Sequence, residues 1–291
     1  MKAGKDEILR REVVRTPDRT FLLLLTERDL GADYPGMIIY TLRILSGDTE
    51  MARFGTNTYE YPGSSPISAR IVAEAKADDW KRELLSNPSE FLAWHQSRGV
   101  RPIGDSGVPE VLILQGSPRP SGNCSMIAGW AQDAAEKAGK TVSVIYLDDL
   151  TMKACIGCYQ CYNTGTCIFE DDMAGIIRAL SAARVVIVCT PVYTNTVPGS
   201  LKIVIDRCQA YHAFQVLKGP SQEKKGLLFS VAGRKGKGNF ICIIKVVDAF
   251  MKNIRIRPCG KVLIDDMDHV RDIGSIEGVE LQIRNAVEKV L

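Results

Sequence analysis

Four of the nine cysteines lie within thirteen residues, in the stretch CIGCYQCYNTGTC that runs from Cys155 to Cys167. Their spacing is Cys-x2-Cys-x2-Cys-x5-Cys, and the first three resemble the opening of the bacterial ferredoxin run, in which thiolates surround one [4Fe–4S] cube. Gly157 and Gly165 permit the tight backbone that such wrapping requires. The even spacing of the first three cysteines therefore favours an iron–sulfur cluster in this segment.

Other uses of these thiols remain open on spacing alone. Four thiolates also make a closed structural zinc site, although zinc sites more often consist of two Cys-x2-Cys pairs separated by a longer loop. Catalytic or inert thiols are a further alternative. The charged N-terminus, MKAGKDEILRREVVRTPDR, has no apolar core of a secretory signal, so we expect a cytoplasmic protein. Disulfides are disfavoured in that compartment.

A loop suited to a phosphate group precedes the cysteines in the stretch GSPRPSGNCS, Gly116–Ser125. It follows an expected strand and opens an expected helix, where backbone N–H groups and the helix dipole favour an anion. The backbone N–H of Cys124 belongs to the same turn. The side-chain donors that we expect to contact a phosphate are Ser117, Arg119, Ser121, Asn123 and Ser125. The alternative is a solvated strand–helix turn with a Ser or Asn helix cap.

Two further loops follow later strands. TPVYTNTVPGSLKIVIDR (Thr190–Arg207) holds an open, proline-bounded loop whose backbone groups could meet the polar edge of a flavin ring. SVAGRKGKGN (Ser230–Asn239) is rich in glycine and basic residues, and it could lie against a planar ligand and its phosphates. Taken alone, the first loop is equally compatible with a proline-stiffened connector, and a glycine-rich basic loop such as the second is more often only a mobile turn. The residues of interest in these loops are Pro191, Val192, Tyr193, Thr194, Asn195, Ala232, Gly233, Arg234 and Gly238.

These loops are positioned by an alternation of strands and helices that begins at Val111. The expected strands are apolar runs at Val111–Gln115, Thr141–Leu147, Arg184–Thr190, Gly226–Ala232 and Lys261–Asp265. The expected helices lie near Ser125–Ala138, Asp172–Ala182, Ser200–His212, Phe240–Lys252 and Ile276–Val290. This alternation predicts an α/β fold with a doubly wound, five-stranded parallel sheet of the flavodoxin-like order. In that order the carboxyl ends of the strands meet at a crevice that holds a flavin mononucleotide.

The first third of the chain does not show this alternation of strands and helices. Residues 1–105 contain two apolar stretches, a turn-rich segment and helical material, and we expect a small α+β appendage of unassigned role. A Gly-, Pro- and Ser-rich stretch, Ser97–Pro109, is the expected linker to a second domain at 106–291 that carries the cysteine loop 155–167. Lys and Arg exceed Asp and Glu by only 37 to 34, and no apolar run approaches a membrane span. We therefore expect neither a nucleic-acid nor a membrane partner.

GSPRPSGNC, CIGCYQCYNTGTC, EDDM, PVYTNTVPGSLKIVIDR and the glycine loop occur in the order found in iron–sulfur flavoproteins, which are relatives of NAD(P)H-dependent FMN reductases. The resemblance covers roughly Val111 to Asp265, and the third loop departs from the family's Gly-Gly-Gln-Glu. The resemblance implies FMN, one [4Fe–4S] cluster and a homodimer or homotetramer. The ligands that it implies for the cluster are Cys155, Cys158, Cys161 and Cys167. Its phosphate loop matches Ser117, Arg119, Asn123 and Ser125, and its ring-edge loop matches Pro191, Val192, Tyr193 and Thr194.

The function that follows is an oxidoreductase that carries electrons between a one-electron donor, such as ferredoxin or a similar redox protein, and a small two-electron acceptor. The cofactors supply that chemistry, so we expect no indispensable acid or base among the side chains. One alternative is a cluster-free NAD(P)H-dependent FMN or quinone reductase. Another is a non-catalytic flavin-binding module that recognises a protein partner.

Overall fold

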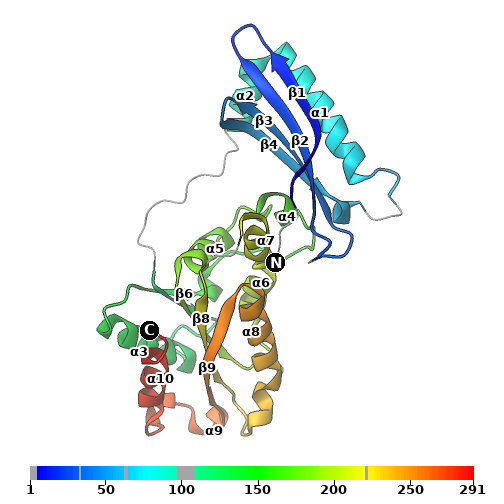
Figure 1. Cartoon of the computed structure of the whole chain (residues 1–291). Coiled ribbons are helices and arrows are strands. Elements are labelled where there is room, and N and C mark those ends of the chain that lie inside the picture. Colours follow the sequence, from blue (N-terminus) through cyan, green and yellow to red (C-terminus); the bar gives the residue numbers. More distant parts are fainter. Residues whose placement is uncertain (1–4, 33, 62–64, 97–108, 220–221) are drawn as a thin grey trace. The chain divides into compact units, whose positions relative to one another are not determined.

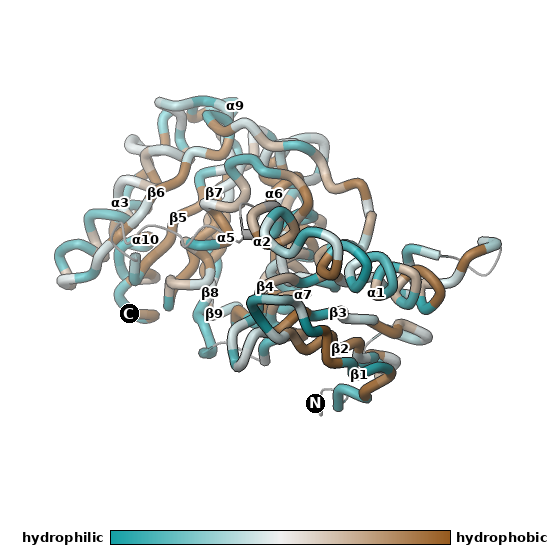
Figure 2. Tube along the Cα trace, turned by 90° about the horizontal axis from the view of Figure 1, so that it is seen from above, coloured by the Kyte–Doolittle hydropathy of each residue, from teal (hydrophilic) through white to brown (hydrophobic). Residues whose placement is uncertain are grey.

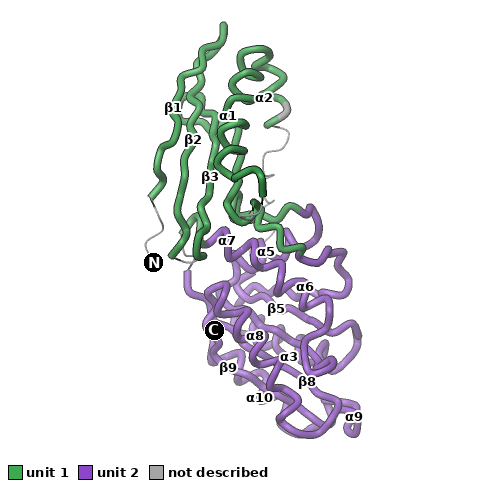
Figure 3. The backbone as a smooth tube through the Cα atoms, turned by 90° about the vertical axis from the view of Figure 1, so that its right-hand side faces the viewer, with its two compact units in different colours: residues 1–103, 156–168, 216–219 green, residues 104–155, 169–215, 220–291 purple. Residues whose placement is uncertain are grey.

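The chain forms two compact units in the computed structural model, which describes residues 5–32, 34–61, 65–96, 109–219 and 222–291 (Figure 3). Unit 1 contains the described residues of Met1–Ile103 together with Ile156–Ile168 and Val216–Gly219. Unit 2 contains those of Gly104–Cys155, Phe169–Gln215 and Pro220–Leu291. The sequence places the whole cysteine loop in the second domain, whereas residues 156–168 pack with the first unit. The reason is a set of long-range polar and aromatic contacts described below.

The sheet of unit 2 is parallel, and it has five strands in the described part of the chain, in the order β6-β5-β7-β8-β9. Its strands are β5 (Val111–Gln115), β6 (Val142–Tyr146), β7 (Val185–Pro191), β8 (Lys224–Val231) and β9 (Ile256–Ile264). Every residue of β5 is buried, as expected for a strand covered on both faces. The predicted flavodoxin-like fold is therefore confirmed.

Helices cover both faces of this sheet. The longer ones are α3 (Asn123–Lys137), α5 (Met173–Ala182), α6 (Gly199–Arg207), α7 (Gln209–Lys218), α8 (Ile241–Asn253) and α10 (Val279–Glu288). The short ones are α4 (Cys161–Thr164), α9 (Met267–Val270), η2 (Leu147–Asp149), η3 (Lys237–Phe240) and η4 (Ile273–Ser275). Apolar residues of α3 and α10 form one core with the sheet, and those of α5, α6, α7 and α8 form the other. The loops at the carboxyl ends of the strands are thus left at one edge, between the two layers.

Unit 1 is built on an antiparallel sheet with the order β1-β2-β3-β4 within the described residues (Figure 1). Its elements are β1 (Glu7–Arg15), β2 (Thr20–Asp29), β3 (Ile38–Ser46), β4 (Thr49–Asn57), η1 (Thr58–Glu60), α1 (Ala69–Ser86) and α2 (Pro88–Gln96). The apolar colouring of Figure 2 runs along β2, in which Phe21, Leu23 and Leu25 alternate toward the core. The expected α+β character is thus observed.

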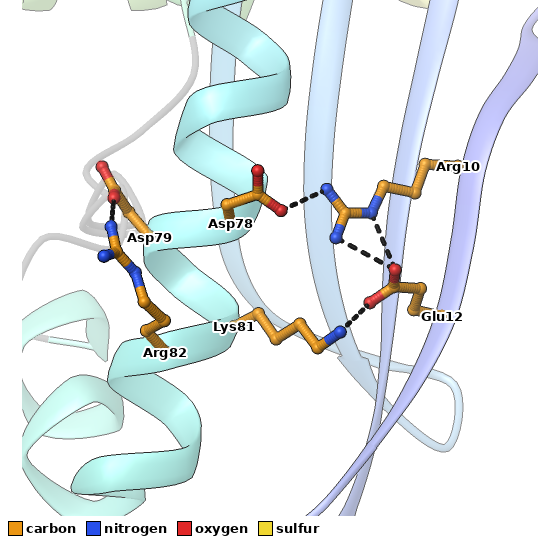
Figure 4. Close-up of polar contacts among 6 residues, drawn as sticks. All are labelled: Arg10, Glu12, Asp78, Asp79, Lys81 and Arg82. Atoms are coloured by element: carbon orange, nitrogen blue, oxygen red, sulfur yellow. Dashed lines mark hydrogen bonds and ion pairs between the residues drawn. The ribbon is translucent and has the colours of Figure 1, made fainter.

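Helix α1 covers one face of the antiparallel sheet because alanines and large apolar residues recur every three to four positions. Its buried residues are Ala69, Ala73, Ala77, Trp80 and Leu84. Beside this core, Asp78 and Lys81 of α1 form ion pairs with Arg10 and Glu12 of β1, at 2.7 and 2.9 Å respectively (Figure 4). The helix is therefore fixed to the sheet by apolar packing and flanked by ion pairs.

All of the expected linker except Pro109 lies outside the described residues. Among the helices of the described ranges, none is long and apolar enough to cross a membrane.

Candidate functional site

A pocket of about 1060 Å³ lies at the carboxyl ends of strands β5, β7, β8 and β9 in unit 2. Each of the three predicted loops contributes to its lining. The predicted residues that line it are Ser117, Arg119, Ser121, Asn123, Cys124, Pro191, Val192, Tyr193, Thr194, Asn195, Ala232, Gly233 and Arg234. Ser125 and Gly238 are not among the lining residues. The topology thus gathers at one crevice loops that are far apart in the sequence.

The loop between β5 and α3 is shaped by the buried amide of Gln115. The Ser117 backbone N–H donates to Gln115 Oε1 at 2.8 Å, and Gln115 Nε2 donates to Ser125 Oγ at 2.9 Å. Ser125 Oγ in turn donates to the carbonyl of Arg119 at 3.2 Å, so this side chain acts inside the loop. Gly122 is the N-cap of α3, and the described structure shows no side-chain hydrogen bond capping that end. The Ser125 N–H donates to the Gly122 carbonyl at 2.9 Å, which leaves the backbone N–H groups of Asn123 and Cys124 to meet an anion in the pocket.

Asn123, which lines the pocket, also makes two side-chain hydrogen bonds to a neighbouring segment. Its Nδ2 donates to the carbonyl of Arg271 at 3.0 Å, and its Oδ1 accepts from the backbone N–H of Ile273 at 3.1 Å. Both ends of the amide thus fix the segment after α9, which borders the same pocket. The Cys124 thiol is buried, and burial raises its pKa to about 12, so that the thiol stays protonated at neutral pH.

The loop after β7 contains a tight turn with an unusual backbone. Tyr193 and Thr196 exchange N–H to carbonyl hydrogen bonds of 2.8 and 2.9 Å around the turn. Thr194 and Asn195 between them have φ of 46° and 62°, as in a type I′ turn, although neither is glycine. A β-branched residue in the left-handed region is disfavoured, and such residues concentrate at ligand sites. This backbone strain supports a binding role for the loop.

The loop after β8 is held by the segment that follows β9. The backbone N–H groups of Met267 and Asp268 donate to the carbonyls of Ala232 and Gly233 at 3.0 and 2.9 Å. A Cβ atom on Gly233 would lie 2.5 Å from Asp268 Oδ1, so any larger residue here would displace the Asp268 carboxylate. Asp268 therefore stands directly against the backbone that faces the pocket.

Several lining residues were missed by reasoning from the sequence. They are Gly122, Met126, Val231, Asn239, Met267, Asp268, Arg271 and Asp272. Four of these follow β9, and the rule that ligands bind at the carboxyl ends of parallel strands could have indicated them. With Arg271 included, the lining holds three arginines and two aspartates, which gives the pocket an excess of positive charge.

The cysteine segment follows β6 and is anchored at both stems within unit 2. Arg207 is buried, and its Nη1 and Nη2 each donate to a carboxylate oxygen of Asp171 at 2.9 Å. Arg207 Nη1 also donates to the carbonyl of Lys153 at 2.6 Å, while the Lys153 N–H donates to Asp171 at 3.0 Å. Residues on both sides of the cysteines are thereby tied together. Burial opposes ionisation of Asp171, but the hydrogen bonds from Arg207, Lys153 and Met173 outweigh it and lower its pKa.

The donor chemistry of the segment suits a soft metal centre. All nine cysteines lie in the described ranges and are thiols rather than disulfides. Cys155 is exposed and Cys158, Cys161 and Cys167 are partly exposed, whereas burial raises the pKa of Cys189 well above its usual value. Accessible thiols can ionise and bind iron or zinc. No group of three or more His, Cys, Asp or Glu side chains in the described part of the chain is arranged to hold a metal ion.

Comparisons with known proteins agree with a flavin-binding fold that carries a cysteine segment. The family model described as NADPH-dependent FMN reductase matches residues 109–253. An iron–sulfur flavoprotein of Methanocaldococcus jannaschii is 31% identical over 154 residues, which are 52% of this chain and 75% of that protein. A second one from that organism is 35% identical over 98 residues, 34% of this chain and 51% of its own length. An iron–sulfur flavoprotein of Methanosarcina thermophila is 33% identical over 34% of this chain and 51% of its own length.

The chain thus spans about half the length of the latter two relatives. Among solved structures, an NAD(P)H:quinone oxidoreductase from Methanothermobacter marburgensis superposes with a TM-score of 0.48 and 15% identity, over 63% of this chain and 94% of that one. The family assignment depends on the sequence matches, above all on the relative of which three quarters is covered. The chain belongs to the iron–sulfur flavoproteins, a family of flavin oxidoreductases related to the NADPH-dependent FMN reductases.

Proposed function

We propose that this chain binds FMN in the pocket of unit 2 and a [4Fe–4S] cluster on Cys155, Cys158, Cys161 and Cys167, and that it transfers electrons between a one-electron donor such as ferredoxin and a small two-electron acceptor. When bound, FMN supplies two-electron chemistry and the cluster supplies one-electron transfer. The single observation that carries the proposal is the pocket at the carboxyl ends of the parallel strands, in a chain whose accessible cysteine segment follows the adjacent strand β6.

The phosphate of FMN fits the N-terminal end of α3. The first-turn N–H groups, the helix dipole, the Ser117 and Ser121 hydroxyls and the Arg119 guanidinium all favour an anion there. Gln115 fixes the loop in one conformation, so the donors are ordered before the phosphate arrives. Preorganised donors bind more tightly because less conformational entropy is lost on binding.

The flavin ring fits between the loops after β7 and β8. Residues 191–195 offer backbone N–H and C=O groups on one side, and Gly233 allows close approach of the backbone on the other. Tyr193, which is 40% exposed, supplies an aromatic surface at the opening of the pocket. These residues orient the ring and exclude water from one side of it, and no side-chain proton transfer is required of them.

A second candidate is a cluster-free NAD(P)H-dependent flavin or quinone reductase on the same fold. It is favoured by the description of the matching family model, NADPH-dependent FMN reductase. In this case the pocket would keep its role and the cysteines would be structural thiols or would bind zinc. The two candidates differ in what the cysteines hold.

Replacing one cysteine separates the candidates. We expect Cys158→Ser, purified and reconstituted without oxygen, to lose most of its iron and to keep its flavin, because the thiolate is a ligand and the flavin pocket lies elsewhere. The matched control is Cys242→Ser, an exposed thiol on α8 outside the segment, which should retain both. Iron and flavin counted per chain provide the measurement. No iron in either protein would leave the cluster-free reductase as the function, and equal bound iron in both would contradict the assignment of Cys158 as a ligand.

A further inference from the structure

Residues 156–168 of the cysteine segment pack in unit 1, against the antiparallel sheet (Figure 3). The short helix α4, which begins at Cys161, lies beside the end of β4. Neither the parallel fold nor the flavin pocket explains these contacts, and no role for the N-terminal region was predicted from the sequence.

Four donors converge on the carboxylate of Glu60, in the η1 turn after β4. Its Oε1 accepts from Asn57 Nδ2 at 2.9 Å and from Asn163 Nδ2 at 2.5 Å. Its Oε2 accepts from Gln160 Nε2 at 2.6 Å and from Thr56 Oγ1 at 3.2 Å. Two of these donors belong to the sheet end and two to the cysteine segment. One carboxylate thereby joins stretches of chain that are about one hundred residues apart.

The two asparagine side chains in this network around Glu60 are buried. Asn57 and Asn163 are 0% and 1% exposed, and Asn57 Nδ2 donates to Asn163 Oδ1 at 2.9 Å. A Cβ atom on Gly55 would lie 2.7 Å from the Asn163 Cβ, so the strand has a glycine where the segment approaches most closely. Buried amides that lose their partners are costly, which makes this network specific for one arrangement of the segment.

The network also supports a strained residue between two of the cysteines. Tyr159, which follows Cys158, has a φ of 58° in the left-handed region. Asn57 Nδ2 lies 3.3 Å from the Tyr159 carbonyl, and the Tyr59 ring packs edge-on against the Tyr159 ring with centroids 5.1 Å apart. Three residues further on, the fully buried Tyr162 packs against Tyr34 with ring centroids 4.8 Å apart. Left-handed backbone in a non-glycine residue persists only where its surroundings impose it.

We propose that unit 1 holds the cysteine segment in its binding conformation, with Glu60 as the positioning residue for Cys158 and Cys161. The assignment of those cysteines to a metal centre rests on the proposed function. The fixation of residues 156–168 by unit 1 does not, because it is a property of the metal-free chain. Glu60 touches no cofactor in this proposal. It acts through Asn163, Gln160 and Asn57 on the backbone that carries the thiols.

Hydrogen exchange of the metal-free full chain tests the holding directly. We expect Glu60→Gln to increase exchange in residues 156–168 by at least about tenfold, because an amide N–H₂ would face two donors where a carboxylate oxygen now accepts. Exchange in strands β5 and β7 should not change. Glu50→Gln, at the opposite end of β4 in an exposed pair with Arg53 at 3.7 Å, is the matched control and should leave the segment unaffected.

A charge exchange distinguishes positioning from simple damage. In the double variant Glu60→Gln with Gln160→Glu, the carboxylate moves to the other side of the same hydrogen bond. We expect this variant to recover at least half of the protection from hydrogen exchange that residues 156–168 lose in Glu60→Gln. Gly55→Ala should increase exchange in the segment as Glu60→Gln does, whereas Gly129→Ala, with open space around its Cβ position, should not. Unchanged exchange of residues 156–168 in both Glu60→Gln and Gly55→Ala would overturn the proposal.

Iron content is the second readout. With iron supplied anaerobically, Glu60→Gln should bind less than half as much as wild type, with the double variant and Glu50→Gln close to wild type. If wild type binds no iron but the exchange pattern is as expected, the cluster assignment fails and the holding role stands. If wild type binds iron and Glu60→Gln changes neither exchange nor iron, the holding role fails and the cluster assignment stands.

Discussion

Gly233 lines the pocket at a position where the size of the residue matters. The carboxylate of Asp268 occupies the space where a Cβ would stand, and Asn123 hydrogen-bonds to Arg271 and Ile273 a few residues further along the same segment. The glycine was predicted from its position in a glycine-rich loop. Its partner was not, because an aspartate in a charged segment has no pattern that distinguishes it from a solvated side chain.

Gly233→Ala should therefore weaken FMN binding. A methyl group displaces the exposed carboxylate of Asp268 from its place beside the Gly233 backbone, and because a side-chain end moves rather than backbone, the cost lies at the low end of the range of about 1–3 kcal/mol for overpacking. We expect the dissociation constant for FMN to rise roughly tenfold. Fluorescence titration of the flavin-free protein measures it. Gly129→Ala on α3, where the Cβ meets no atom within 4 Å, is the control and should bind FMN as wild type does.

Arg207 is the residue on which the stems of the cysteine segment depend. Arg207→Met leaves the Asp171 carboxylate buried without its cation, and we expect a loss of about 3–5 kcal/mol in the free energy of unfolding at pH 7. Lys202→Met on the same helix removes an exposed ion pair with Asp206 and should cost about 1 kcal/mol or less. Urea unfolding of the three proteins gives the comparison. A loss as small as that of Lys202→Met would mean that the buried pair does not hold the stems.

The same pair gives a pH dependence with a defined sign. Because the pKa of Asp171 is lowered in the folded state, its contribution to stability is present above its unfolded pKa of about 3.9 and is lost as the pH falls through the lower folded value. Without Arg207, the backbone hydrogen bonds from Lys153 and Met173 remain, but burial is no longer offset by the guanidinium, so the pKa of Asp171 rises and protonation at low pH removes the buried charge. The cost of Arg207→Met should therefore be largest at pH 7 and should shrink below about pH 4. A cost that grows on acidification would contradict this assignment.

At the scale of elements, the sequence predicted the strands of the parallel sheet, but for the first third of the chain it indicated only two apolar stretches in an α+β appendage. β5 and β7 are continuous apolar runs because both faces are covered, and such runs are easily recognised. β1 and β4 were missed, since one face of each is exposed and charged residues interrupt their apolar pattern. The contact of the cysteine segment with η1 was not predicted either, because a hydrogen bond between Glu60 and Asn163 leaves no local signal in the sequence.

Helix α1 offers a test of what holds the antiparallel unit together. Trp80 is buried against Phe54 and Phe91, with centroids 6.3 and 5.5 Å away, whereas the neighbouring Lys81 is exposed and pairs with Glu12. We expect Trp80→Ala to lower the free energy of unfolding by about 3–5 kcal/mol and Lys81→Met to lower it by at most about 1 kcal/mol. Thermal unfolding followed by circular dichroism gives both values. Equal effects would show that the ion pairs matter as much as the core.

At the scale of the whole molecule, one chain combines a flavin-type pocket with a cysteine segment whose two parts are secured differently. The stems are tied within unit 2 by Arg207 and Asp171, and residues 156–168 are held within unit 1 by Glu60 and Asn57. The proposed electron transfer requires both cofactors in the same chain. It also predicts that disturbing the N-terminal unit changes the metal content before it changes the flavin content.

The most direct test of the proposed function is the anaerobic optical and EPR spectrum of the wild-type chain, taken together with its iron and flavin content. We expect one flavin and about four irons per chain, with a broad cluster absorbance and an EPR signal on one-electron reduction. A chain that binds one flavin and no iron after anaerobic reconstitution would contradict the cluster. A chain that binds neither would contradict the function proposed for the pocket as well.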